Sequence, residues 1–176
     1  MRGQHGSPGP GGRPGREAGL LESQLQDATQ IICDIYSRYL FEASVFEKRE
    51  EQFLDADALC DLMTQAQQRS YGDGLAEDCR HPYMWICKSH YYGPTFYNFP
   101  YAFGGLFARG LYAQYTAEGA AFVPKYKKLL YTTPIATAED AAAEAGIDLT
   151  DKNFWRSALQ IIADQIDYFC ELLSGT

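Results

Sequence analysis

The chain has 176 residues, of which 46% are hydrophobic, and a formal net charge of −8. A chain of this length can bury about 70% of its unfolded surface, which is enough for one domain with its own core. No uncharged apolar run is long enough to span a membrane, and no basic cluster is large enough to follow the phosphates of a nucleic acid.

Residues 1–19 differ from the rest of the chain because glycine, proline and arginine dominate and apolar residues are nearly absent. Such a segment cannot bury enough surface to offset its ordering entropy. It also lacks the continuous apolar stretch of a secretion signal. We therefore expect residues 1–19 to be a disordered leader and residues 20–176 to form the folded part.

A long amphipathic helix is predicted from Leu20 to about Phe53, either unbroken or bent near Ala43. Its apolar residues recur at steps of three or four, with no glycine or proline inside. Asp55 is expected to cap a second helix, whose end is marked by Gly72 and Gly74. The first helix exceeds the average length of about three turns, so several partners are needed to cover its apolar face.

The short apolar segment after Pro82 is too brief to assign to helix or strand. Asn98 followed by Pro100 has the pattern of an N-cap with proline in the first turn, which predicts a helix from Phe99 to Thr116. A further helix is predicted over residues 121–130, where Pro124 is tolerated in the first turn.

Two helices are predicted near the C-terminus. Thr137 is expected to cap a short one that Gly146 ends, and Thr150 or Asp151 to cap the last one. In that last helix the apolar residues keep helical spacing over residues 154–169. No alternating strand pattern occurs, so the predicted fold class is all-α.

The cysteines of the chain are dispersed and odd in number: Cys33, Cys60, Cys79, Cys87 and Cys170. Most stand in stretches with apolar, helical patterning. This favours reduced core thiols in a cytoplasmic protein over a disulfide framework or a zinc site.

The segment SHYYGPTFYNFPYAFG, residues 89–104, holds seven aromatic residues and one of the three histidines. A tyrosine hydroxyl donates a hydrogen bond at neutral pH and can stabilise an oxyanion in a dry cleft. Gly93 and Pro94 allow the backbone to turn sharply beside a ligand. The candidate polar groups are His90, Tyr91, Tyr92, Tyr97 and Tyr101. Residue chemistry alone favours the other interpretation, in which these rings only pack.

Metal sites find little support in the sequence. The acidic stretch EKREEQ, residues 47–52, is typical of a solvated helix face. His81 and His90, with Cys87 between them, lack the short ligand spacing of a zinc site.

Three stretches resemble one known family: LLESQLQDATQIICDIYSRYLFEASVFEKRE, HPYMWICKSHYYGPTFYNFPYAFGGLFARGLYAQY and AGIDLTDKNFW. They are similar to the C-terminal part of the catalytic domain in the oligoendopeptidase F branch of the thimet-oligopeptidase-like zinc metallopeptidases. The resemblance runs over nearly all of residues 20–173. It implies part of an all-α clamshell whose central channel admits short peptides, and a zinc ion held by a His-Glu-x-x-His helix and a later glutamate.

The resemblance assigns roles to the aromatic segment. It implies that His90, Tyr97 and Tyr101 stabilise the oxyanion and bind the peptide backbone. The neighbouring residues expected to contact substrate are Tyr91, Tyr92 and Gly93. Gly104 and Gly105 are expected to let the following helix pack closely behind the site.

The chain departs from the family pattern at the metal site. None of its histidines begins a His-Glu-x-x-His motif: His5 precedes Gly6, His81 precedes Pro82 and His90 precedes Tyr91. The resemblance therefore implies zinc in the intact family enzyme but none on this chain's own residues. The expected partners are short peptide substrates and a missing upstream metal-binding portion, without which the chain is inactive. The alternatives are a non-catalytic helical module that binds peptides or a partner, and an inactive truncated remnant.

Overall fold

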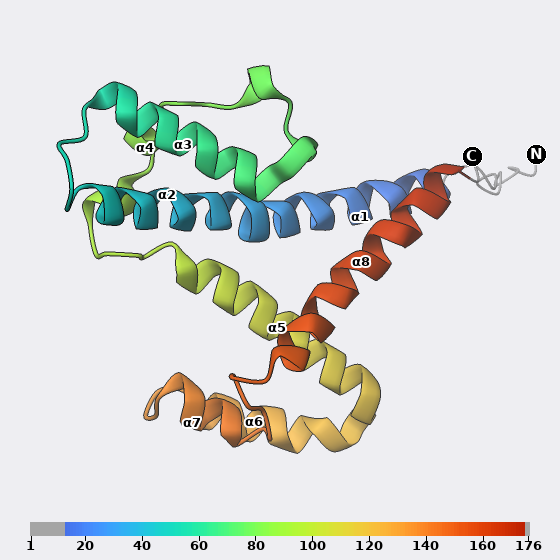
Figure 1. The fold of residues 1–176 in the computed structure, drawn as a ribbon. Helices are drawn as coiled ribbons and strands as arrows, with labels where there is room; N and C mark the ends of the chain where they lie inside the picture. The colour runs from blue at the N-terminus through green and yellow to red at the C-terminus, as the bar shows by residue number, and fades with distance from the viewer. Residues whose placement is uncertain (1–12, 175–176) are drawn as a thin grey trace, which may run out of the picture.

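The computed structural model describes residues 13–174, and this part of the chain contains helices and no strand (Figure 1). The all-α prediction is confirmed. The α-helices, in chain order, are α1 (Arg13–Thr29), α2 (Ile35–Lys48), α3 (Ala56–Tyr71), α4 (Met84–Cys87), α5 (Phe99–Glu118), α6 (Val123–Thr132), α7 (Ala138–Ala143) and α8 (Lys152–Ser174). Short 3-10 turns connect several of them: η3 (Gly72–Gly74), η4 (Glu77–Cys79), η5 (Ser89–Tyr92) and η6 (Gly119–Phe122).

The first two helices form one continuous rod, joined by a π-helical turn, η2 (Gln30–Asp34). A π-turn inserts an extra residue into the helical ladder. The predicted long helix is present, but its irregularity lies at η2 and not near Ala43, and it ends at Lys48 instead of Phe53. Helix α3 packs along one side of this rod, while α5 and α8 approach it from the other (Figure 1).

Residues 13–19, which the sequence assigns to the leader, form the first part of helix α1 in the structure. One hydrogen bond and one buried side chain attach this part of α1 to the rest of the molecule. The Tyr168 hydroxyl donates to Glu17 Oε1 at 2.6 Å, and Leu21 is buried close behind. The remainder of the predicted leader, residues 1–12, lies outside the described residues.

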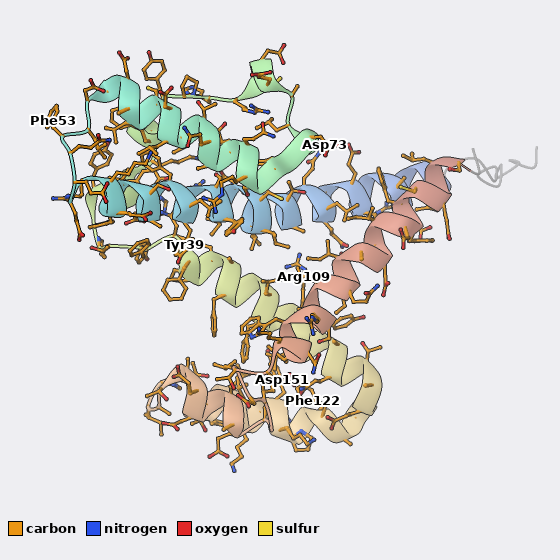
Figure 2. The ribbon with its side chains drawn as sticks, in the orientation of Figure 1. Tyr39, Phe53, Asp73, Arg109, Phe122 and Asp151 are labelled. Carbon is orange, nitrogen blue, oxygen red and sulfur yellow. The ribbon has the colours of Figure 1, made fainter. Side chains whose placement is uncertain are left out.

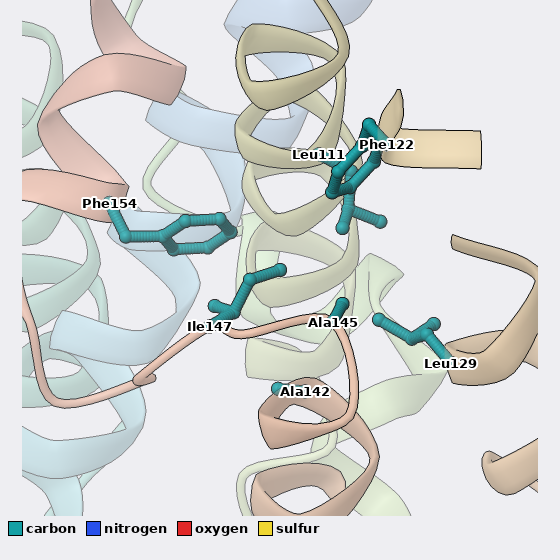
Figure 3. Close-up of a cluster of buried hydrophobic side chains, with 7 residues drawn as sticks. All are labelled: Leu111, Phe122, Leu129, Ala142, Ala145, Ile147 and Phe154. Atoms are coloured by element: carbon teal, nitrogen blue, oxygen red, sulfur yellow. The ribbon is translucent and has the colours of Figure 1, made fainter. Parts of the chain in front are cut away.

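Two apolar clusters stabilise the fold. The N-terminal core joins α2 to α3 through Leu40, Phe41, Leu62, Met63 and Ala66. The C-terminal core (Figure 3) is built from Leu111, Phe122, Leu129, Ala142, Ala145, Ile147 and Phe154. Helix α5 contacts the rod as well as α8, so it connects the two halves of the molecule.

Two glycines of α5 allow close approach. A Cβ added at Gly105 would lie 2.7 Å from Ile31 Cγ2, and one at Gly110 would lie 2.4 Å from Phe154 Cζ. The close packing expected at Gly105 is confirmed. A Cβ at Gly104 would meet nothing within 4 Å, so the same expectation for Gly104 is wrong.

Most predicted helix caps are confirmed. Asp55 accepts a hydrogen bond from Ala58 N, Thr137 accepts one from Asp140 N, and Asp151 accepts one from Asn153 N. Asn98 is the exception, because it has helical backbone angles and makes no capping hydrogen bond. Its side chain is instead fully buried and accepts from Arg38 Nη1 at 3.4 Å, so a tertiary contact replaces the local one.

All five cysteines are free thiols. Cys33 and Cys60 are half-buried, and burial raises the pKa of Cys33. The prediction of core thiols is wrong for Cys79, Cys87 and Cys170, which are exposed. Cys79 and Cys87 lie on single helical turns with too little regular structure to bury them.

Across residues 13–174, none of the helices combines the length and apolarity that crossing a bilayer requires.

Candidate functional site

The aromatic segment follows an irregular path between α4 and the start of α5. It consists of the short turn η5 and an open stretch that contains Gly93 and Pro94. Regular helix is blocked here because a proline disfavours helical geometry in the residue before it. Many of its aromatic rings therefore remain outside the two cores.

Three residues of this segment form what we call the aromatic cluster: His90, Tyr97 and Tyr101. His90 Nε2 lies 3.3 Å from the Tyr101 hydroxyl oxygen. The His90 ring stacks on Tyr97 with centroids 5.9 Å apart, and Tyr101 meets both rings edge-on at 5.7 and 6.1 Å. The residues to which the family resemblance assigns oxyanion binding thus lie together.

Access to the cluster is open. Tyr97 is 48% exposed and Tyr101 is 46% exposed, so solvent reaches both side chains. The Tyr97 hydroxyl makes no hydrogen bond to any described residue, and the Tyr101 hydroxyl has only His90 as its partner. The Tyr97 hydroxyl is therefore free to donate to a ligand, and the Tyr101 hydroxyl donates to one when His90 carries its proton on Nε2 and is itself the donor to the phenol oxygen.

The other three candidates lie outside the cluster. Tyr91 packs edge-on against Phe41 at 5.1 Å beside the N-terminal core, and burial raises its pKa well above the usual range. The Tyr92 hydroxyl donates to the Trp85 carbonyl at 3.2 Å. A Cβ added at Gly93 would meet nothing within 4 Å, and the φ of this residue is negative, so its backbone does not require glycine.

A cleft of about 460 Å³ adjoins the cluster. It lies between the rod, the segment after α4 and the start of α5. Its lining residues are Gln30, Ile31, Ile35, Arg38, Lys88, His90 and Tyr101. This volume is within the range of about 300–1,000 Å³ typical of ligand pockets.

A buried polar network supports the segment from behind. Arg38 pairs with Asp34 and donates to Asn98 Oδ1. Glu42, only 6% exposed, accepts a hydrogen bond from Phe96 N at 2.7 Å. Tyr97 therefore lies between two residues that are hydrogen-bonded to α2: Phe96 through its backbone N–H and Asn98 through its side chain.

Phe96 shows the effect of this attachment on the backbone. Its φ of 56° is positive, a value that is strained for a bulky side chain and is held only by strong surroundings. Its ring lies between Tyr39 and Phe46, with centroid distances of 5.5 and 5.6 Å. The hydrogen bond to Glu42 and these ring contacts together hold Phe96 in place, and with it the orientation of Tyr97.

The sequence interpretation missed this polar network. Asp34, Arg38 and Glu42 recur at steps of four and therefore lie on one face of the rod. That face also carries the buried Ile35 and Phe41 nearby. Charged residues at helical spacing beside an apolar stripe were the signal that could have identified them.

Metal ligands are not grouped in the part of the chain that the structure describes. No set of three or more His, Cys, Asp or Glu residues there could hold an ion. The backbone of His81 exchanges hydrogen bonds with the Gln67 side chain, and its ring lies against Tyr83. The residues present therefore do not fit a zinc ion.

Comparison with known proteins gives a distant relationship. Oligopeptidase PepF from Bacillus subtilis strain 168 is 26% identical over 134 residues, which is 76% of this chain and 20% of that protein. The matched region thus spans about a fifth of the relative's length. No family model matches the chain, and no solved structure matches it. The chain is therefore a distant relative of an oligopeptidase.

Proposed function

We propose that the chain supplies the substrate-binding side of a peptidase that hydrolyses short peptides. The observation that carries this proposal is the aromatic cluster, in which His90, Tyr97 and Tyr101 come together beside an open cleft. The distant likeness to oligopeptidase PepF supports the same class of reaction.

The proposed role of the cluster is to stabilise negative charge on the peptide carbonyl oxygen. The Tyr97 and Tyr101 hydroxyls donate to this oxygen, and His90 fixes the direction of the Tyr101 hydroxyl through the 3.3 Å contact. Fixed donors of this kind stabilise a developing oxyanion better than water does, because they need no reorganisation. The Glu42 and Asn98 contacts hold the segment in position for this task.

A zinc-dependent reaction requires ligands from outside residues 13–174, because these contain no group able to hold a metal. In the proposal, zinc and its ligands belong to a complementary metal-binding portion. When bound there, zinc would polarise the scissile carbonyl and activate water. The chain described here contributes binding and oxyanion stabilisation only, so by itself it is inactive.

A chimera tests this proposal. This chain replaces the matching segment in oligopeptidase PepF, and cleavage of an internally quenched peptide is measured with and without a chelator. We expect chelator-sensitive cleavage, and we expect Tyr101→Phe to lower kcat by about 10²–10³-fold because one oxyanion donor is lost.

Tyr112→Phe is the matched control for that substitution. Tyr112 also lies on α5 and is 60% exposed, but it contacts Tyr115 and not the aromatic cluster. It should leave kcat unchanged. A chimera that melts cooperatively, yet cleaves nothing while the parent enzyme does, would refute the proposal.

A non-catalytic peptide-binding module is the second candidate, favoured by the lack of a metal-holding group among the described residues. The chimera separates the two. In a simple binding module Tyr101→Phe changes peptide affinity little, whereas in a peptidase it lowers kcat with KM nearly unchanged.

A further inference from the structure

The cleft beside the aromatic cluster has a charge opposite to that of the chain. Arg38 and Lys88 line it, whereas none of its lining residues is an aspartate or glutamate. The whole chain carries a net charge of −8, so a pocket without carboxylates is a marked local departure. A partly enclosed site lined by one sign of charge concentrates ligands of the other sign.

Lys88 is the cation with unmatched charge. It is half-buried, and it forms no ion pair with any carboxylate among residues 13–174. The ammonium group itself keeps contact with solvent, so it is available to an anionic group of a ligand. The segment after α4 therefore places an unpaired positive charge at the cleft.

Arg38 gives the cleft a fixed second cation. It is 5% exposed, and its guanidinium is oriented by the ion pair with Asp34 and the bond to Asn98. Asp34 offsets part of this charge, but it lines a different cavity, beside α3. The Arg38 Nε and the His90 Nδ1 are buried without hydrogen-bond partners among the described residues, so polar atoms around the cleft remain available.

The remaining lining residues of the cleft are uncharged or aromatic, and two of them, Ile31 and Ile35, are apolar. Ile31 and Ile35 form the rod side, and the Tyr101 ring marks the end that adjoins the aromatic cluster. A peptide whose carboxylate lies at Lys88 therefore shares the cleft with both isoleucines and with Tyr101.

From this arrangement we infer that the cleft binds the carboxylate of a peptide, with Lys88 as the principal cation and Arg38 as a fixed second charge. The inference rests on the proposed function and names its substrate class: peptides that carry a carboxylate a short distance from the bond held at the aromatic cluster. The carboxylate can be the C-terminal group or an acidic side chain.

Peptide titration with the full chain tests the inference. The probe is an N-acetylated hexapeptide, Ala-Ala-Ala-Ala-Ala-Leu, used as the free acid, as the C-terminal amide, and as an amide with glutamate in place of the last alanine. We expect the free acid to bind about 10-fold more tightly than the plain amide, because a hydrogen bond to a charged group is lost in the amide. If the glutamate amide also gains affinity, acidic side chains are accepted; if not, the site selects the terminal carboxylate. Both results support a carboxylate site.

Variants of Lys88 provide the specificity control. Lys88→Gln should abolish the difference between acid and amide, whereas Lys88→Arg should retain most of it. Lys127→Gln is the matched control, because Lys127 is an exposed lysine of α6 without an ion pair to a described residue, and it should change nothing. Equal binding of acid and amide, no binding of either at millimolar concentration, or an unchanged difference in Lys88→Gln would each overturn the inference.

The two proposals fail in different ways. If the chimera cleaves acid and amide probes with the same KM, the carboxylate site is refuted while the peptidase proposal stands. If the chain discriminates the free acid through Lys88 but a folded chimera never cleaves, the peptidase proposal fails and the carboxylate site remains.

Discussion

The C-terminal core contains only apolar side chains, whereas the N-terminal core lies in the part of the molecule that also holds the buried polar residues. Those residues all fall between positions 37 and 98: Ser37, Arg38, Glu42, Gln67 and Asn98. Apolar burial stabilises without a preferred direction. Hydrogen bonds have defined geometry, and a buried group left without one is costly. The C-terminal half is therefore stabilised mainly by apolar burial. In the N-terminal half, buried hydrogen bonds also hold the aromatic segment in a defined position.

Side-chain positions make the same contrast visible (Figure 2). Phe122 lies in the lower part of the molecule, and Tyr39 lies on the rod near the start of α5. Tyr39 is 43% exposed and Phe122 is 2% exposed. The ring of Phe122 is thus buried in the C-terminal core, whereas the rings of Tyr97 and Tyr101 at the candidate site remain partly exposed.

The largest effect is expected from Phe154→Ala. Phe154 is 7% exposed and fills the space that Gly110 leaves open, so truncation creates a cavity. We expect a loss of about 3–5 kcal/mol in the free energy of unfolding, measured by urea denaturation. Leu159→Ala on the same helix is the control, since Leu159 is 43% exposed and should cost far less. Equal losses would mean that this core does not depend on burial.

Glu42→Ala is expected to have a smaller effect on stability and a larger one on local structure. It removes the acceptor for Phe96 N and leaves that partly buried donor unsatisfied, which costs about 1–3 kcal/mol. Amide chemical shifts around Tyr97 should move, while those of the C-terminal core should not. Glu42→Gln, which keeps an acceptor oxygen, should restore most of both. Shift changes spread evenly over both cores would contradict the contrast.

Alkaline pH should affect the N-terminal half first. Burial, and then the nearby Asp34 and Cys33, raise the pKa of Tyr71 to about 12. A raised pKa in the folded state means that the neutral phenol is favoured. Its contribution to stability is therefore complete below the unfolded value near 10 and is lost as the pH rises toward 12. Unfolding measured between pH 9 and about 12 should show this loss, and Tyr71→Phe should reduce it. An identical alkaline profile in Tyr71→Phe would exclude this residue as the cause.

The smallest effect on stability is expected from Tyr101→Phe. Tyr101 is 46% exposed and its hydroxyl contacts only His90, so the free energy of unfolding should change by less than about 0.5 kcal/mol. The His90 ring resonances should nevertheless shift, because the 3.3 Å contact is lost. A loss of stability as large as that of Glu42→Ala would identify Tyr101 as a structural residue.

Helix caps were predicted correctly from the sequence where the capping hydrogen bond joins neighbouring residues. Asp55 and Thr137 cap helices because their side chains reach backbone donors within the same turn. The pattern at Asn98 is equally good in sequence, but burial against Arg38 decided its conformation. Such a contact joins residues 60 positions apart, and helix-capping rules contain no information about it.

The candidate site was only partly predictable. The resemblance brought forward His90, Tyr97 and Tyr101, and the structure places them together. The supporting Glu42 and the cleft residue Lys88 were not identified, because their significance depends on packing between α2, α5 and the segment after α4. Their charge alone does not distinguish Glu42 and Lys88 from the solvated charged residues elsewhere in the chain.

Helix α5 has a mechanical consequence for the site. Ile31 of the rod packs closely against α5 at Gly105, and Phe154 of α8 packs closely against it at Gly110. At a rise of about 1.5 Å per residue, these supports stand roughly 7.5 Å apart along the axis. The N-terminal end of α5 is held as well, because Asn98, which precedes the helix, is buried and accepts a hydrogen bond from Arg38. Tyr101 therefore stands in the first turn of a helix whose position is fixed by the rod and by α8 together.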